Sequence, residues 1–107
     1  MRWIAIFTDT PTMLAVRAQQ GQAHLDFLAR HKTEIVLAGG CRSDAGGDYV
    51  GGDYVGGDYV GGLWVLEVSD RARAVALIEQ DPYYLSGARQ YVLRTWGKAF
   101  EEDRVVL

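Results

Sequence analysis

The chain has 107 residues, which is enough for one hydrophobic core but not for two. Hydrophobic residues make up 49% and charged residues 23% of the sequence, the balance of a folded globular domain rather than a disordered chain. The net charge of −3 gives no electrostatic reason to expect nucleic-acid binding, and no apolar run approaches the roughly 20 residues that span a bilayer.

The first part of the chain predicts a strand, a helix and a second strand. Residues 2–8 are apolar and β-prone, and because Asp9 follows at once we interpret them as a buried strand rather than a signal peptide. Thr10 before a proline is typical of a helix start, so a helix is expected over residues 11–31. A second strand is expected at about 34–41. The apolar stripe of the helix is expected to comprise Leu14, Ala18, Leu25 and Leu28, with Phe27 at its edge.

The last part predicts a strand, a helix and a closing strand. A strand is expected at 63–68, and Ser69 or Asp70 then caps a helix that runs to about Gln80. The closing strand is expected at 89–96. The inward-facing residues of this second helix are expected to be Ala72, Val75, Ala76 and Leu77.

This order of elements, βαββαβ, predicts an α+β domain over residues 1–107. The two βαβ units of this order together form a ferredoxin-like sandwich of the dimeric α/β-barrel type, which is an antiparallel sheet with two helices on one face. The uncovered face of so small a sheet needs a partner. We expect Trp3, Trp64 and Tyr91 to lie on that face and to pair with a second copy in a homodimer.

A perfect repeat interrupts the domain. The sequence Gly-Gly-Asp-Tyr-Val occurs three times over residues 46–60, and the whole glycine-rich insertion, 46–62, falls between the second and third predicted strands. A period of five matches neither a strand nor a helix, so Tyr49, Tyr54 and Tyr59 cannot line one face of either element. Because paired glycines suit two-residue hairpin turns, we expect either a protruding hairpin or a mobile loop.

Two histidines could carry chemistry. His31 lies in the last turn of the predicted first helix, where a cation interacts favourably with the helix dipole, so we interpret it as a capping residue. His24 lies in the middle of the helix, on the same stripe as Arg17. A solvated or hydrogen-bonded histidine without a catalytic role could occupy the same position. Asp81, before Pro82, either shapes a turn through its local backbone or partners an imidazole and fixes its tautomer for proton transfer. The sequence alone does not place His24 beside Asp81.

The chain resembles a known family in the order and spacing of several short motifs. They are Ala23-His24-Leu25, Ala38-Gly39-Gly40, Asp81-Pro82-Tyr83 and the closing strand. These motifs are similar to those of the YCII-related (YciI-like) proteins, and the resemblance covers nearly the whole chain except the duplicated copies. It implies a ferredoxin-like fold, a dimer and a histidine–aspartate active site, which His24 and Asp81 would form here.

The resemblance also implies a class of reaction. Relatives with a defined reaction resemble dehydrochlorinases of hydroxylated aromatics, and fold neighbours include muconolactone isomerases. The hypothesis is an acid–base enzyme for a small molecule, in which His24 transfers the proton, Asp81 orients it and Arg17 steadies an anionic oxygen. The family often has a second arginine where this chain has Gly21, and a proline where it has Gly40. The alternative is a non-catalytic module that binds a small ligand or a partner, with the repeat as an assembly element.

A few other residues are candidates for binding a substrate or a metal ion. Ser43, near the start of the loop, could line the pocket and contact substrate. The single cysteine, Cys41, excludes an intrachain disulfide, fits a cytoplasmic protein and is interpreted as a small core residue. The repeated aspartates do not have the spacing of a calcium loop, and no glycine-rich nucleotide motif precedes a helix. We expect no metal and no cofactor, with a second copy and a small-molecule substrate as partners, and no nucleic acid or membrane.

Overall fold

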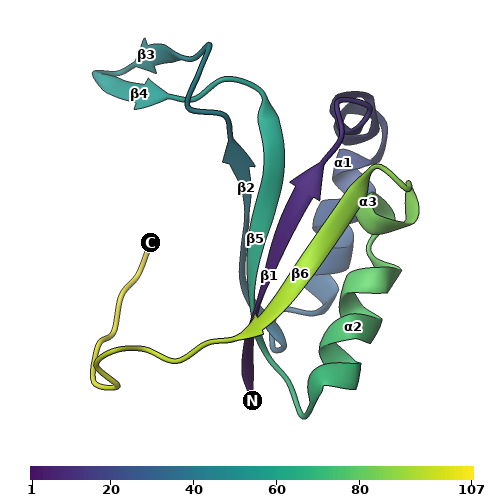
Figure 1. Cartoon of the computed structure of the whole chain (residues 1–107), viewed down its shortest axis with the longest axis vertical. Helices are drawn as coiled ribbons and strands as arrows, with labels where there is room; N and C mark the ends of the chain where they lie inside the picture. The colour runs from purple at the N-terminus through teal and green to yellow at the C-terminus, as the bar shows by residue number, and fades with distance from the viewer.

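The computed structural model describes all residues, 1–107, and its centre is a four-stranded sheet. The strand order is β2-β5-β1-β6, and every neighbouring pair is antiparallel. Three helices cover one face of this sheet (Figure 1). The ferredoxin-like βαββαβ arrangement is thus confirmed, with one short helix added after the second long one. The strands are β1 (Arg2–Asp9), β2 (Ile35–Arg42), β5 (Tyr59–Glu67) and β6 (Arg89–Thr95), and the helices are α1 (Met13–Arg30), α2 (Arg71–Gln80) and α3 (Pro82–Leu85).

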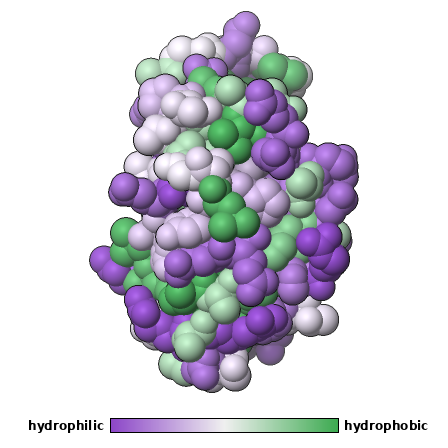
Figure 2. Space-filling view, turned by 90° about the vertical axis from the view of Figure 1, so that its right-hand side faces the viewer, coloured by the Kyte–Doolittle hydropathy of each residue, from purple (hydrophilic) through white to green (hydrophobic).

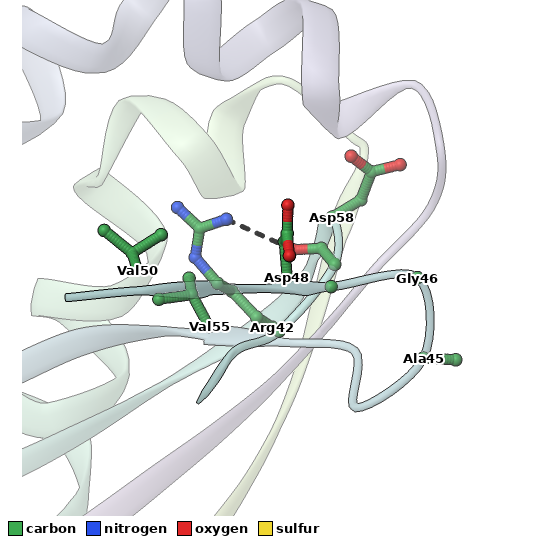
Figure 3. A pocket seen from close by; sticks show the side chains of 10 residues that line it. Arg42, Ala45, Gly46, Asp48, Val50, Val55 and Asp58 are labelled. Carbon is green, nitrogen blue, oxygen red and sulfur yellow. Dashed lines mark hydrogen bonds between the residues drawn. The ribbon is translucent and has the colours of Figure 1, made fainter. Parts of the chain in front are cut away.

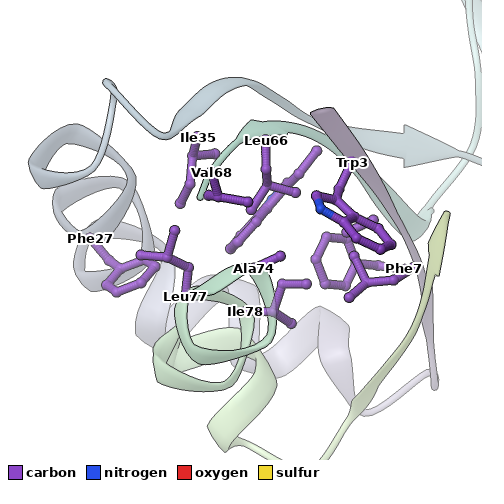
Figure 4. Close-up of a cluster of buried hydrophobic side chains, with 12 residues drawn as sticks. Trp3, Phe7, Phe27, Ile35, Leu66, Val68, Ala74, Leu77 and Ile78 are labelled. Atoms are coloured by element: carbon purple, nitrogen blue, oxygen red, sulfur yellow. The ribbon is translucent and has the colours of Figure 1, made fainter. Parts of the chain in front are cut away.

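The hydrophobic core lies between the sheet and the helices. Alternate residues of β1, Trp3, Ala5 and Phe7, point toward the helices, as the period of two in a strand requires. Figure 4 shows side chains of β1 facing those of α2. An edge-to-face contact between Phe7 and Trp64, with ring centroids 5.0 Å apart, joins β1 to β5. The remaining core residues are Phe27, Ile35, Leu66, Val68, Ala74, Leu77, Ile78 and Leu93.

The tryptophans are therefore not on the outer face of the sheet, and that expectation was wrong. Trp64 is 1% exposed, Trp3 is buried beside it, and Tyr91 packs half-buried against the same core. The pairing of Ala5 with Trp64 places both residues on the helix side of the sheet. Cys41, interpreted as a core residue, is instead exposed near the end of β2. The side chains that face away from the helices include the aliphatic Ile6, Leu63 and Val92 and the charged Arg2, Glu67 and Arg94.

The buried faces of both long helices also differ from the predicted stripes. In α1 the buried residues are Met13, His24 and Phe27, whereas Leu14 and Leu25 are exposed. The apolar spacing was misleading because two polar residues, Arg17 and His24, belong to the inner face. In α2 the buried residues are Ala74, Leu77 and Ile78, while Ala72 is exposed and Val75 and Ala76 are half-buried.

The first two copies of the repeat form a hairpin of their own. Strand β3 (Asp48–Val50) pairs with β4 (Asp53–Val55), and Gly51 and Gly52 turn between them with φ of +60° and +88°. Positive φ at both turn positions matches the twist of the flanking strands, and glycine adopts it without a Cβ clash. The hairpin is thus the form that the insertion takes, and it projects to the side of the sheet opposite the helices (Figure 1).

The third copy belongs to the main sheet instead. Strand β5 begins at Tyr59, four residues before its predicted start at residue 63. Arg42 of β2 pairs with Tyr59, and the amide of Ser43 donates to the carbonyl of Asp58 at 2.9 Å. The β2–β5 ladder therefore reaches the base of the hairpin, and the last tyrosine of the repeat is held beside the domain.

The two faces of the molecule differ in character. Figure 2 shows the helix-covered side, where hydrophilic residues predominate and hydrophobic ones form separate small patches. The segment after β6 leaves the domain on the other side, the one toward which the hairpin projects (Figure 1). It carries the exposed Phe100 and ends at Leu107, which is 92% exposed. None of the helices is both long enough and apolar enough to cross a membrane.

Candidate active site

A buried histidine–aspartate pair lies between α1 and the end of α2. Nδ1 of His24 is 2.7 Å from Oδ1 of Asp81, and the Asp81 side chain is completely buried. The ring of His24 stacks on that of Tyr83, with centroids 3.8 Å apart and planes 8° from parallel. With Asp81 ionised, Nδ1 carries the proton and donates to it, which leaves the lone pair of Nε2 free. Nε2 has no hydrogen-bond partner within the chain.

The backbone at Asp81 explains why its side chain reaches His24. Asp81 ends α2 and precedes α3 in an extended conformation, φ −66° and ψ 131°, which the following Pro82 favours. An aspartate at a helix start ordinarily accepts a bond from the first turn of that helix. Asp81 makes no such bond to α3. Its carboxylate is turned into the core toward the imidazole, and Oδ2 is buried without a partner. The interpretation of Asp81 as a turn residue alone does not account for this orientation.

The pair opens onto a small cavity of about 230 Å³ between α1 and the strands β2 and β5. His24 and Trp64 form part of its floor, and Tyr83 closes one end. Gly21 of α1 also lines the cavity, and a Cβ at this position would make only an ordinary contact, at 3.6 Å, with the Tyr83 hydroxyl. The other residues that line the cavity are Arg17, Leu25, Leu28, Ala38, Gly39, Gly40, Tyr59 and Arg89.

Two arginines of the cavity share one buried carboxylate. Arg89 makes two hydrogen bonds to Asp9, of 2.7 and 3.0 Å, and its side chain is 2% exposed. Arg17 adds a third contact to the same carboxylate at 3.2 Å and a bond to the carbonyl of Gly61 at 3.0 Å. Because two guanidinium groups meet one carboxylate, this side of the cavity carries a net positive charge. Such a site favours an anionic ligand.

Guanidinium groups and aromatic rings alternate along this wall. Arg17 lies over Tyr59 and Tyr83, with distances to the ring centroids of 4.2 and 5.2 Å. Arg89 lies over Tyr83 at 5.1 Å and over Phe7 at 4.6 Å. Each ring stabilises the cations on its face and holds them in place without neutralising them. The positive charge of the wall therefore remains available to a ligand.

The residues singled out from the sequence are distributed unequally. His24, Asp81 and Arg17 come together, with the first and last lining the cavity. Ser43 does not line it. Its hydroxyl accepts a bond from the amide of Ala45 at the base of the hairpin. His31 is the residue that ends α1, as expected for a capping position.

Sequence reasoning missed several residues of the site. Arg89 of β6 supplies the second guanidinium of the cavity, beside Arg17 of α1. Asp9 gave a weak signal as a lone carboxylate at the end of an apolar strand. Tyr83 belongs to the Asp81-Pro82-Tyr83 motif, and that motif was the signal that could have found it. Nothing distinguished Tyr59 from the other two tyrosines of the repeat.

A second hollow lies away from the pair, beneath the hairpin. It has a volume of about 390 Å³ and is lined by Arg42, two aspartates, two valines and glycine-rich backbone. Figure 3 shows Arg42 in this hollow, with Asp48 and Asp58 nearby and a dashed bond from its guanidinium to the backbone. That bond, to the carbonyl of Gly57, measures 3.2 Å. No group of three or more histidine, cysteine or acidic side chains anywhere in the chain is placed to hold a metal ion.

Comparison with known protein families identifies the family of this chain. The model of the YCII-related domain matches residues 1–97, which include the whole sheet, all three helices and the histidine–aspartate pair. The chain belongs to the YCII-related family. Only the last ten residues of the chain lie outside the match to this YCII-related domain. Among curated proteins, none matches the sequence significantly.

A solved structure shares the fold. It is the 5-chloro-2-hydroxyhydroquinone dehydrochlorinase of Burkholderia phenoliruptrix AC1100, in complex with 2,5-dihydroxybenzoquinone. The likeness covers 91% of this chain and 94% of that one, with a TM-score of 0.74 and 22% sequence identity. At this identity the likeness establishes the YCII-related, ferredoxin-like fold. Activity depends on the site itself.

Proposed function

We propose that this YCII-related protein is an acid–base enzyme that moves a proton on a small anionic molecule. The observation that carries the proposal is the buried His24–Asp81 pair, 2.7 Å apart, which leaves Nε2 free beside a cavity. A carboxylate on Nδ1 fixes the tautomer and makes Nε2 a better base. An ordinary core histidine needs neither a wholly buried carboxylate nor a cavity.

The proposed step is a proton abstraction by His24. Nε2 takes a proton from the substrate, and Asp81 stabilises the imidazolium that results. In a dehydrochlorination the electron pair of the broken bond to hydrogen stays in the substrate and forms a new π bond. The carbon–chlorine bond breaks with its pair on chloride. In an isomerisation the same imidazolium returns the proton to another atom of the substrate. Both reactions use the pair identically, and the substrate determines which one follows.

Arg17 and Arg89 hold the substrate in this proposal. Removal of a proton from a hydroxyl or an activated carbon leaves negative charge on oxygen, and guanidinium groups that are already oriented stabilise it. Asp9 and the aromatic rings hold both guanidinium groups in place before the substrate arrives. The solved neighbour binds 2,5-dihydroxybenzoquinone, a small planar hydroxylated ring. We propose this chemical class, including chlorinated members, as the first substrates to test.

The test measures turnover of chlorinated hydroxyhydroquinones as the rate of chloride release. It compares wild type with His24→Gln and Asp81→Asn. Loss of a positioned general base lowers turnover by about 10²–10⁴-fold. Asp81→Asn keeps the size of the side chain and removes the charge that orients Nδ1–H, so kcat falls with little change in KM. His31→Gln is the matched control, because His31 does not line the cavity.

The alternative, a non-catalytic binding module, makes a different prediction. If the wild type binds 2,5-dihydroxybenzoquinone in a titration but releases no chloride and exchanges no substrate proton, the cavity is a ligand site without catalysis. Turnover that is unchanged in His24→Gln refutes the assignment of the base. A cytosolic location also belongs to this proposal, because an exposed free thiol, Cys41, suits a reducing compartment.

A homodimer is proposed through the uncovered face of the sheet. Ile6 pairs with Leu63 on one side and with Val92 on the other, and these three neighbours are 43%, 42% and 44% exposed. A row of apolar side chains across three strands is typical of a surface that a second copy covers. The hairpin and the C-terminal segment extend to the same side of the sheet, where they flank this face (Figure 1).

A further inference from the structure

The cavity has a buried floor and an open rim. The floor residues His24, Trp64 and Arg89 are all less than 10% exposed. At the rim Gly39 and Gly40 are exposed and contribute no side chain. Tyr59 is the one aromatic side chain of the rim, and it is half-buried. The Tyr59 ring and the exposed side chain of Leu25 therefore border the opening toward His24.

The ring of Tyr59 is held from two sides of the chain. The guanidinium carbons of Arg17 and Arg42 each lie 4.2 Å from its centroid. Arg42 also donates a hydrogen bond of 3.1 Å to the tyrosine hydroxyl. No carboxylate lies within ion-pair distance of Arg42, which lines the adjacent hollow beneath the hairpin. Cation–π contacts of this kind orient a ring at a partly exposed site.

The neighbouring strand, β2, has a glycine without a side chain at the place where this ring lies. A Cβ at Gly40 would lie 2.7 Å from Cε1 and 2.8 Å from Cδ1 of Tyr59, closer than real Cβ atoms approach any atom. The ring therefore lies directly over the backbone of Gly40, in space that a side chain there would fill. In the β2–β5 ladder Gly40 pairs with Gly62 and Tyr59 with Arg42, and the Tyr59 ring extends along β2 to Gly40. Replacement of Gly40 or Tyr59 changes the rim.

We propose that Tyr59 is the specificity-determining residue of the cavity and controls access to His24. Its ring, in contact with the guanidinium groups of both Arg17 and Arg42, admits narrow planar anions and keeps bulkier molecules from the imidazole. The role of His24 as the destination rests on the proposed function, whereas the control of access rests on the contacts of Tyr59 alone.

The repeat supplies this tyrosine independently of its copy number. Only the third copy contributes to the cavity, since Tyr49 and Tyr54 pack against each other in the hairpin, with ring centroids 5.5 Å apart. Removal of residues 46–55 joins Ala45 to Gly56 and leaves a four-residue loop between Ser43 and Asp58, which are already hydrogen-bonded. Loops of four residues are common in hairpins. Copies can be lost or gained without displacement of the tyrosine that stacks on Arg17.

The experiment measures access to His24 without any substrate. Diethyl pyrocarbonate acylates an accessible neutral imidazole, and peptide mass spectrometry gives the rate at His24 relative to His31 in the same molecule. Tyr59→Ala should raise this ratio severalfold, and Gly40→Ala, which displaces the ring without removing it, should raise it as well. Tyr59→Phe keeps the ring in contact with the arginines and should change the ratio little. Because no turnover is measured, the result is independent of whether His24 is catalytic.

Three variants serve as matched controls. Tyr49→Ala and Tyr54→Ala remove the same side chain from the other copies, and deletion of residues 46–55 removes both copies at once. All three should keep the wild-type ratio, and circular dichroism should verify that every variant is folded. An unchanged ratio in both Tyr59→Ala and Gly40→Ala overturns the proposal. So does a deletion variant whose His24 reacts as fast as that of Tyr59→Ala.

Discussion

Asp9 is the single carboxylate that contacts both arginines of the cavity, so it neutralises only part of their charge. Its side chain is fully buried and accepts hydrogen bonds from both Arg89 and Arg17. Burial of charge is tolerated only where partners compensate the lost hydration. Nε of Arg17 is buried without a partner, so the network inside the chain is not complete.

The first prediction follows from this network. Arg89→Met should lower the free energy of unfolding by about 3 kcal/mol, because Asp9 stays buried with only the longer contact to Arg17. Urea denaturation at neutral pH measures the change. The double variant Asp9→Asn/Arg89→Met removes both charges and should recover part of the loss. A loss in Arg89→Met well below about 1 kcal/mol contradicts a tightly coupled buried pair.

The residues of the site were only partly predictable. His24 and Asp81 could be named through the family resemblance of the motifs around them, because the residues alone left a solvated histidine and a turn-forming aspartate as alternatives. Arg89 could not, because it opens a strand whose alternation gives no sign of a charge on the inner face. The apolar stripe of α1 was misplaced for the same reason: Arg17 and His24 occupy inner positions that a count of apolar residues assigns to solvent.

At the scale of elements, α2 is tied to the chain before β2. Asp70 caps the helix by accepting from the amide of Arg73 at 2.9 Å. Arg73 in turn makes two hydrogen bonds of 2.8 Å to the carboxylate of Glu34. This bidentate hydrogen bond is the main cause that lowers the pKa of Glu34 below its ordinary value of 4.5. The contact links one end of the sheet to the start of a helix.

The second prediction is a pH dependence from this contact. A carboxyl group whose pKa is lower in the folded state stabilises the fold above its unfolded pKa, and that stabilisation is lost as the pH falls through the folded pKa. Wild type should therefore exceed Glu34→Gln in urea midpoint at neutral pH, and the two should converge well below pH 4.5. The difference is small, because the pair is partly exposed. Glu102→Gln, an exposed control, should match wild type throughout, and a constant gap for Glu34→Gln contradicts the linkage.

The positions of most elements followed from local signals. Thr10-Pro11, Asp70 and Pro82 mark helix boundaries by chemistry that acts within a few residues, and the long helices were found within about two residues of their observed ends. The start of β5 was placed late because glycine and aspartate disfavour strands in isolation. Pairing with β2 outweighs that preference, and the third copy of the repeat becomes a strand.

For the whole molecule, the proposed dimer gives the third prediction. Ile6→Glu places a charge in the middle of the uncovered face and should shift sedimentation velocity from dimer to monomer, because burial of an unpaired carboxylate is unfavourable. Leu85→Glu is the matched control, since Leu85 is 68% exposed on α3, on the other side of the sheet. A monomeric wild type, or an Ile6→Glu variant that remains dimeric, refutes this interface.

The sequence by itself determined the order of elements and the absence of an intrachain disulfide, because each depends on residue type or near neighbours. Only the tertiary structure decided which face of the sheet holds the tryptophans and where the second guanidinium comes from. It also gave three identical copies of Gly-Gly-Asp-Tyr-Val different surroundings. Their local preferences are the same, so contacts with distant residues, Gly40, Arg17 and Arg42, select Tyr59 for the cavity.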